Sequence, residues 1–126
     1  MQNPKNLRAF SVAEDLAVAV CSATRQFPPD ERFGLTSQMR RATVSVGSNI
    51  AEGCGRRGNK ALLAFVYVAI GSCNELEYQL RLAIRLKFLT PGEARPSYES
   101  IKGVRTMLVR LVTQLRLRAD EPPGSQ

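Results

Sequence analysis

The sequence predicts an all-α protein, an antiparallel up-down-up-down four-helix bundle. Apolar residues recur every three or four positions over four long segments, which is the spacing of one helix face. The breaks between these segments are short and rich in proline and glycine. Short connections between long helices favour antiparallel neighbours. The 126 residues suffice for one hydrophobic core. We therefore expect a single domain over residues 1–118 and a disordered tail over residues 119–126.

The first expected helix covers about residues 6–26, and the second covers about residues 34–53 or 37–53. Pro28 and Pro29 separate them, because proline cannot continue a helix and restricts the residue before it. Small residues dominate the second segment, which favours a central helix that its neighbours approach closely. The apolar stripes of these two segments are formed by Phe10, Ala13, Leu16, Ala17, Val20, Leu35, Met39, Ala42, Val46 and Ile50.

The third expected helix covers about residues 59–87, roughly 40 Å at 1.5 Å per residue, with Asn59 as its N-cap. The fourth begins at the capping box formed by Thr90 and Glu93 and runs to the end of the domain. Pro96 lies inside it and would either kink the helix or split off its first turn. The apolar stripes are formed by Leu62, Val66, Ala69, Cys73, Leu76, Leu80, Ala83, Ile84, Ile101, Val104, Leu108, Leu111, Val112 and Leu115.

The stretch 53–58 reads G-x-G-x-x-G, and Glu75 and Glu77 follow at about the distance typical of a dinucleotide-binding fingerprint. That fingerprint needs a strand before the glycines and a second strand that ends at the acidic residue. Residues 59–77 instead have the pattern of one unbroken helix. The helical pattern of residues 59–77 therefore argues against nucleotide binding.

A turn between helices explains the same glycines better. Gly53 and Gly55 would take the positive φ that ends a helix, and Asn59 would start the next one. Arg56 and Arg57 in this turn either bind phosphate close to the helix N-terminus or are simply solvated.

Composition excludes several classes of protein. The chain has no histidine, the commonest general base and metal ligand, so we expect no enzyme, no metal and no cofactor. The three cysteines are widely spaced without a C-x-x-C pair, which indicates reduced thiols. No apolar run approaches the roughly 18 residues of a membrane span. The opening MQNPKNLRAF lacks the apolar core of a signal peptide, so we expect a cytoplasmic protein.

Basic residues are in excess and unevenly distributed. The net charge is +7, and residues 79–118 hold nine basic residues against two acidic ones. Fourteen of the 18 basic residues are arginine, which is suited to bidentate phosphate contacts. The excess indicates either a polyanionic partner, above all a nucleic acid, or a solvated basic surface.

One acidic residue and one thiol stand out as candidates. Glu77 falls on the apolar side of its helix, where a carboxylate is costly unless it is paired. We expect a structural ion pair with an arginine such as Arg41 or Arg81; a catalytic carboxylate is the alternative. Cys54 lies in the expected turn, where exposure would make it reactive, but only neighbouring arginines suggest a lowered pKa and we assign it no role.

The aromatic residues give little sign of nucleic-acid binding by themselves. Tyr67 and Tyr78 are candidates for stacking on bases, but the sequence shows no interleaving of aromatic and basic residues typical of single-strand binders. We assign four phenylalanines to packing, namely Phe10, Phe27, Phe33 and Phe65.

Two long segments of the sequence resemble those of a known protein family. They read ERFGLTSQMRRATVSVGSNIAEGCGRR (residues 31–57) and AIGSCNELEYQLRLAIRLKFLT (residues 69–90), and the opening LRAFSVAEDLA and the link FPPDERFGL fit as well. The motifs ERFGL, Q-x-R-R-A and SNIAEG occur in that order. On these residues the chain resembles, over about residues 7–115, the bacterial four-helix-bundle family named for the 23S ribosomal RNA intervening-sequence proteins. It departs at Gly47, where the family often has proline.

The resemblance implies a cytosolic bundle that assembles as a homopentamer and associates with RNA or the ribosome. It also implies a distant relation to an accessory protein of diversity-generating retroelements, which binds the reverse transcriptase and nucleic acid through a basic pentameric barrel. The family supplies no catalytic residues. We interpret its polar positions as framework or interface residues, here Gln38, Arg40, Arg41, Asn49, Glu52, Glu75, Glu77 and Gln79.

These observations lead to a non-enzymatic, basic, homo-oligomeric bundle that binds RNA through phosphate contacts. The candidate contact residues are Arg56, Arg57, Lys60, Arg81, Arg85, Lys102, Arg105 and Arg116. One alternative is a scaffold for a protein partner, based on the apolar residues outside the stripes, Phe65, Val68, Leu82 and Leu86. A second is carboxylate or thiol chemistry around Glu52, Glu77 or Cys54. A helix-turn-helix DNA binder fits less well, because the third segment is far longer than a recognition helix needs to be.

Overall fold

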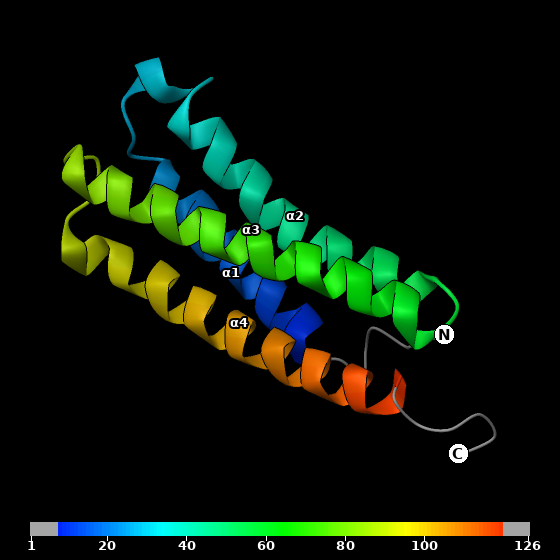
Figure 1. Ribbon diagram of the computed structural model, residues 1–126. Coiled ribbons are helices and arrows are strands. Elements are labelled where there is room, and N and C mark those ends of the chain that lie inside the picture. Colours follow the sequence, from blue (N-terminus) through cyan, green and yellow to red (C-terminus); the bar gives the residue numbers. More distant parts are fainter. Residues whose placement is uncertain (1–7, 120–126) are drawn as a thin grey trace.

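The computed structural model describes residues 8–119 and contains four long helices and one short 3-10 helix in that range (Figure 1). The helices are α1 (Arg8–Thr24), α2 (Leu35–Gly55), α3 (Asn59–Arg85) and α4 (Pro91–Ala119), and the 3-10 helix η2 (Pro29–Glu31) precedes α2. No strand occurs among the described residues. The expected tail lies outside them, except for Ala119, which ends α4.

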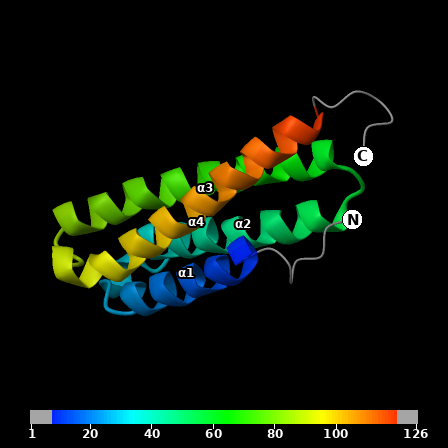
Figure 2. The same ribbon diagram turned by 90° about the horizontal axis from the view of Figure 1, so that it is seen from below.

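The four helices form a bundle in which each packs against two neighbours. α1 and α3 each contact α2 and α4, so α1 lies diagonally opposite α3. The colour gradient reverses direction from each helix to the next in Figures 1 and 2. Polar contacts between α3 and α4 agree with this arrangement, because Tyr67 near the start of α3 bonds Arg116 near the end of α4.

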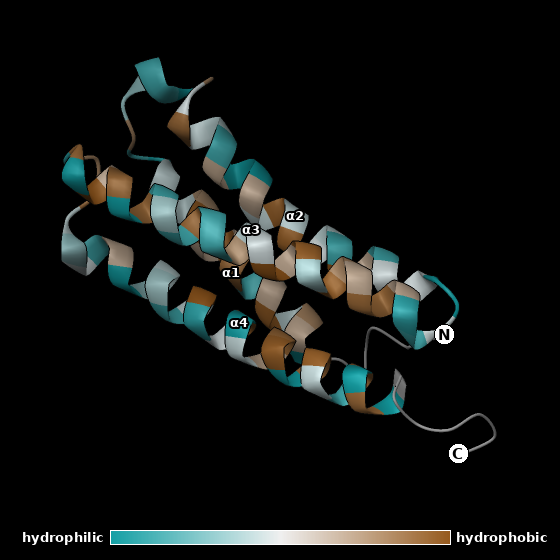
Figure 3. Cartoon of the chain, viewed as in Figure 1, coloured by the Kyte–Doolittle hydropathy of each residue, from teal (hydrophilic) through white to brown (hydrophobic). Residues whose placement is uncertain are grey.

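The predicted apolar stripes form the core. Leu16, Met39, Ile50, Leu80 and Leu108 are all fully buried, and they come from all four helices. Brown and teal alternate along every helix in Figure 3, as expected for amphipathic helices around a shared core. Phe10, Ala17, Ile84 and Leu111 from the predicted stripes are half-buried at its edge. None of the described helices is long and apolar enough to cross a membrane.

The turn between α2 and α3 differs from the expectation. Gly53 and Gly55 lie within α2, and neither has a positive φ. Gly58 has the positive φ instead, at 84°, and it is the N-cap of α3, whereas Asn59 is already helical and makes no cap. A positive φ is easiest for glycine, which has no Cβ. Sequence spacing alone could not tell which of three neighbouring glycines would take it.

Gly53 serves close packing rather than helix termination. A Cβ at this position would lie 2.8 Å from Leu62 Cδ1 and 3.0 Å from Phe65 Cβ. The absence of a side chain therefore lets the end of α2 pack closely against the start of α3.

The opposite end carries both remaining connections, and we call it the double-loop end. The rings of Phe27 and Phe88 lie 5.4 Å apart, and Gln26 Nε2 donates to the Phe88 carbonyl at 3.4 Å, so the α1–α2 and α3–α4 connections touch. The predicted capping box is confirmed: Glu93 N donates to Thr90 Oγ1 at 3.1 Å, and Thr90 N donates to Glu93 Oε1 at 2.8 Å. α4 continues through Pro96 without a break.

Candidate nucleic-acid interface

The eight basic residues predicted to bind nucleic acid fall into two groups instead of one patch. Arg56, Arg57, Lys60 and Arg116 lie near the α2–α3 turn, whereas Arg81, Arg85, Lys102 and Arg105 lie toward the middle and the double-loop end. Lys60 and Arg85 are 25 residues apart on α3, which is roughly 37 Å at 1.5 Å per residue. A single compact ligand site cannot include both groups.

At the α2–α3 end, two of these arginines already bond to other side chains. Arg56 Nη2 lies 2.6 Å from Glu52 Oε1, and its guanidinium carbon is 5.7 Å from the centre of the Phe65 ring. Arg116 Nη1 donates to the Tyr67 hydroxyl at 3.1 Å. Glu52 therefore partly neutralises this end, although Arg57 and Lys60 remain exposed.

The ion pair predicted between Glu77 and an arginine exists, but the arginine is Arg105 rather than Arg41 or Arg81. Arg105 of α4 donates to both carboxylate oxygens of Glu77, at 3.0 and 3.4 Å, and also to Asn74 Oδ1 at 3.1 Å. Spacing along α3 suggested Arg81, but Glu77 lies on the side of α3 that packs against α4. Arg105 thus joins two helices and is not available as a free phosphate contact.

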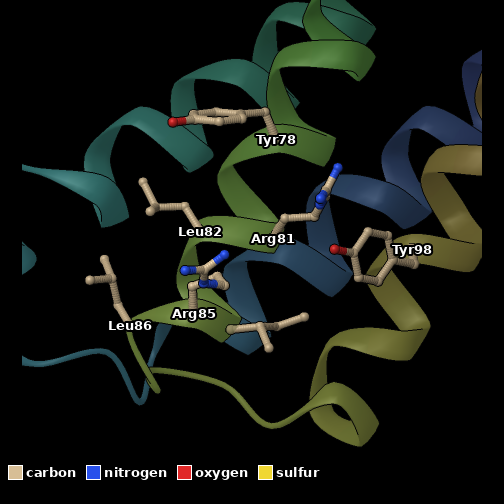
Figure 4. Close-up of a pocket in the computed structure, with 7 residues that line it drawn as sticks. Tyr78, Arg81, Leu82, Arg85, Leu86 and Tyr98 are labelled. Atoms are coloured by element: carbon tan, nitrogen blue, oxygen red, sulfur yellow. The ribbon is translucent and has the colours of Figure 1, made fainter.

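Arg81 and Arg85 lie together in a groove that we call the α3 groove (Figure 4). Its volume is about 660 Å³, and its lining consists of Tyr78, Arg81, Leu82, Ile84, Arg85, Leu86 and Tyr98. Neither arginine forms an ion pair or side-chain hydrogen bond with any described residue. None of the described residues that line the groove is acidic.

The close-up in Figure 4 shows how the α3 groove is arranged. Arg81 extends toward the hydroxyl of Tyr98 on α4, while Leu82 and Leu86 lie on the other side of α3. Partial burial raises the pKa of the Tyr98 hydroxyl; nearby Arg81 opposes this shift and Glu77 adds to it. The tyrosine therefore stays a neutral hydrogen-bond donor at neutral pH. Sequence reasoning missed Tyr98, because its place beside Arg81 depends on α3 and α4 being neighbours.

The predicted framework and interface residues divide into two kinds. Asn49 Nδ2 donates to the carbonyl of Ser45 at 2.8 Å and to its hydroxyl at 3.0 Å, and Ser45 in turn bonds Ser72 of α3 at 2.9 Å. Asn49 is thus part of a polar seam between α2 and α3, and Glu52 and Glu77 are held in their ion pairs. Gln38, Arg41 and Glu75 are exposed, with no side-chain hydrogen bond to a described residue.

The groups proposed for carboxylate or thiol chemistry do not gather. Cys54 lies in the last turn of α2 rather than in the turn, and it is buried, which raises its pKa. Burial raises the pKa of Cys73 to about 11, with Arg105 opposing and Glu77 adding to the shift. Glu52 is exposed and paired with Arg56. Within residues 8–119, no three histidine, cysteine or acidic side chains come together in a way that would hold a metal ion.

Of the four apolar residues considered for protein docking, two are prominently exposed. Val68 is 52 % exposed and Leu86 is 48 % exposed, whereas Phe65 and Leu82 are half-buried. Val68 and Leu82 lie on α3 and Leu86 is the C-cap residue just after it; Leu82 and Leu86 line the α3 groove.

Comparisons with known proteins agree with this fold and place the chain in a family. The model of the 23S rRNA-intervening sequence protein family matches residues 5–110. A solved structure from Bacteroides thetaiotaomicron VPI-5482, described as a protein of unknown function from the S23 ribosomal protein family, is similar with a TM-score of 0.76. At 20 % sequence identity, the match covers 83 % of this chain and 95 % of that one. No curated protein matches the chain. The chain belongs to the 23S rRNA-intervening sequence protein family.

Proposed function

We propose that this protein binds RNA without catalysing a reaction, and that phosphate groups contact Arg81 and Arg85 in the α3 groove. The observation that carries the proposal is the pair of arginines, free of ion pairs among the described residues, in an open groove without an acidic side chain. The family name, which refers to intervening sequences of 23S rRNA, supports RNA as the partner.

The physical basis is the match between guanidinium groups and phosphodiesters. Arginine presents a planar set of N–H donors that pairs with phosphate oxygens in a bidentate way. The net charge of +7 attracts any polyanion, and the release of counterions from RNA adds to the binding free energy. Unpaired arginines contribute most, because no existing ion pair has to be broken first.

A salt titration with matched variants tests this proposal. Nuclease-treated protein is titrated with fluorescent rRNA fragments at several salt concentrations, first as the wild type and then as the double variant Arg81→Gln/Arg85→Gln. The control is Arg110→Gln/Arg118→Gln, which removes the same charge from exposed positions on α4. We expect the groove variant to reduce the slope of log K against log[salt] by about 1.5–2, and the control to reduce it far less.

Two results would contradict the proposal. Absence of RNA binding by the wild type at low salt would mean that the charge is only a solvated surface. Equal loss in the two double variants would mean that RNA responds to net charge and not to the α3 groove. The pair Lys102→Glu/Arg105→Glu, which changes two other candidate contact residues, is a poor test, because changing Arg105 also breaks the link to Glu77.

A second candidate function is an oligomeric scaffold for a protein partner, in the manner of a reverse-transcriptase accessory protein. The exposed Val68 and Tyr78 on α3 and Leu86 just after it favour this function, because exposed large apolar side chains are typical of an interface. We also propose that the protein is a homo-oligomer, with five copies as the resemblance implies. Light scattering coupled to gel filtration measures the stoichiometry, and a monomer at micromolar concentration would contradict both statements.

A further inference from the structure

Phe33 occupies an unexpected place for a large apolar side chain. The sequence assigned it to packing, but it is 89 % exposed between η2 and α2. The other phenylalanines are buried or half-buried. Leaving such a ring in water forgoes roughly 1.5–3 kcal/mol of burial free energy. Its sequence position explains the error: ERFGL links two helices, and only the tertiary structure shows that no helix covers it.

Arg32 lies over this ring, and two further arginines line the same groove. The Arg32 guanidinium carbon lies 5.5 Å from the centre of the Phe33 ring, within the range of a cation–π contact. Arg32 and Phe33, together with Arg40 and Arg41, line a groove of about 610 Å³ on the outer face of α2. We call it the α2 groove. Its remaining lining residues are Phe33, Thr36, Ser37, Val44 and Ser45. The volume falls within the range of small-ligand sites.

The charges of the α2 groove are uncompensated. Arg40 is held in place, because its Nε donates to Thr24 Oγ1 of α1 at 2.9 Å. Arg32 and Arg41 form no ion pair or side-chain hydrogen bond with the described residues. Glu31, the neighbour of Arg32, uses its carboxylate to accept from the backbone N–H of Leu35 at 3.0 Å. The groove therefore combines an uncovered aromatic face, three guanidinium groups and hydroxyls, with no acid in its lining.

We propose that the α2 groove binds unpaired nucleotides of a single nucleic-acid strand. A base stacks on Phe33, the adjoining phosphates meet Arg32 and Arg41, and the hydroxyls of Thr36 and Ser37 bond the sugar or the base edge. Stacking on an exposed aromatic ring requires an unpaired base, because the faces of bases in a duplex are covered by their neighbours.

This inference rests on the proposed RNA binding and extends it to a second surface. The α2 groove includes the first turns of α2, and the α3 groove includes the last turns of α3, so both lie toward the double-loop end. One RNA molecule can therefore contact both. The α3 groove contributes phosphate contacts, whereas the α2 groove selects for unpaired bases.

A tryptophan at position 33 reports directly on stacking, because the chain contains no other tryptophan. The variant Phe33→Trp is titrated with a short oligoadenylate RNA, a DNA of the same sequence, an RNA hairpin with a fully paired stem, and inorganic polyphosphate. We expect saturable quenching by the unpaired strands, and little quenching by the paired stem or by polyphosphate, which carries charge without bases. Equal quenching by RNA and DNA supports base stacking, which the two strands share. Stronger quenching by RNA supports stacking together with a contact to the 2′-hydroxyl.

Affinity measurements with Phe33→Ala complete the test. Loss of one stacked base should weaken oligoadenylate binding about 5- to 100-fold and change hairpin binding less than about twofold. The matched controls are Val18→Ala and Val18→Trp on α1, where an exposed apolar side chain sits beside Glu14 and Asp15. Neither control should alter affinity or show quenching. The thermal midpoint confirms that each variant folds.

Three results overturn the inference. Equal quenching by polyphosphate and oligoadenylate would show that charge alone acts at position 33. Unchanged oligoadenylate affinity in Phe33→Ala would show that RNA binds elsewhere on the protein and that the α2 groove takes no part in binding. A blue shift of the position-33 emission with rising protein concentration, before any RNA is added, would show that another copy of the chain covers the ring. Failure of the wild type to bind any nucleic acid at low salt is a different result, and it rejects the proposed function itself.

Discussion

The two ends of the bundle use their arginines in different ways. At the α2–α3 end, a short turn follows the close approach at Gly53, Arg56 is paired with Glu52 and Arg116 bonds Tyr67, while Arg57 is exposed. Toward the double-loop end, Arg32, Arg41, Arg81 and Arg85 have no such partners among the described residues, and two grooves lie there.

This difference shows that a count of basic residues does not locate a binding surface. The sequence offered no reason to rank Arg56, Arg81 and Arg105 differently, although among the described residues Arg56 and Arg105 have a carboxylate partner and Arg81 has none. A guanidinium in an ion pair must exchange one anionic partner for another, whereas an unpaired one gains a partner. Burial and pairing, which follow from tertiary contacts, decide which charges are available.

The largest expected effect concerns the close approach at the α2–α3 end. Gly53→Val should destabilise the protein by about 1–3 kcal/mol, because its Cβ alone would come within 2.8 Å of Leu62. Gly71→Ala is the matched control, since among the described residues no atom outside the adjoining backbone of α3 lies within 4 Å of the added Cβ. That change should instead stabilise α3 by up to about 1 kcal/mol. Urea unfolding measures both, and a loss of stability at position 71 equal to that at position 53 would refute the packing argument.

The next largest effect is a difference in stability contribution between the Glu77–Arg105 pair and the Glu52–Arg56 pair. Glu77→Ala should cost about 1–2 kcal/mol, because it leaves Arg105 with the amide of Asn74 but without its carboxylate partner between two helices, where the arginine side chain is 28 % exposed. Glu52→Ala should cost no more than about 0.5 kcal/mol, because the Glu52–Arg56 pair is local and its side chains are about half exposed. Chemical denaturation at low salt compares them. Equal costs would mean that the link between α3 and α4 adds nothing beyond a local pair.

A somewhat smaller effect is expected at the double-loop end, where the capping box starts α4. Thr90→Ala should cost about 1 kcal/mol through loss of the bond to the Glu93 N–H. Thermal unfolding measures this change, and Thr106→Ala, an exposed mid-helix position, is the control. An identical midpoint in Thr90→Ala and the wild type would contradict a stabilising cap.

The same capping box has a pH dependence with a definite sign. The backbone N–H of Thr90, followed by the side chains of Gln26 and Thr90, lowers the pKa of Glu93. A carboxyl whose pKa is lower in the folded state contributes stability above its unfolded pKa of about 4.3, and loses it as the pH falls through the folded value. Glu93→Gln should therefore flatten the acid side of the stability profile. Unfolding midpoints between neutral and acidic pH test this, and an unchanged profile would contradict it.

The smallest expected effect leaves stability unchanged and concerns the thiols. Cys54 and Cys73 are buried with raised pKa values, whereas Cys21 is half-buried on α1. A disulfide reagent should therefore label one thiol of the native protein quickly and all three only after unfolding. Absorbance of the released thiolate measures the rates. Rapid labelling of Cys54 would show that the α2–α3 end opens more readily than its packing indicates.

The sequence alone could predict the local features of the fold. Periodicity placed Met39, Leu80 and Leu108 in the core, and the spacing of Thr90 and Glu93 predicted a cap that the structure confirms. These features depend on residues within a few helical turns of one another. The periodic stripe also marks which face of a helix is buried, because water excludes apolar surface whatever the partner is.

Features that involve two helices were predicted less well. The carboxylate of Glu77 was expected to need a cation, but the choice of Arg105 depends on the register between α3 and α4. Phe33 was assigned to packing, yet its side chain is exposed. The place of Tyr98 beside Arg81 likewise follows from the pairing of α3 with α4.

The sequence by itself thus determined the number of helices, their buried faces and the total positive charge, because each of these follows from residue type and local spacing. Only the tertiary structure decided which arginines are paired, which aromatic ring stays uncovered and where the grooves lie. The physical reason is that pairing and exposure depend on distances between segments remote in sequence. Those distances are set by how closely the four helices pack, as at Gly53, and by which faces they leave to solvent.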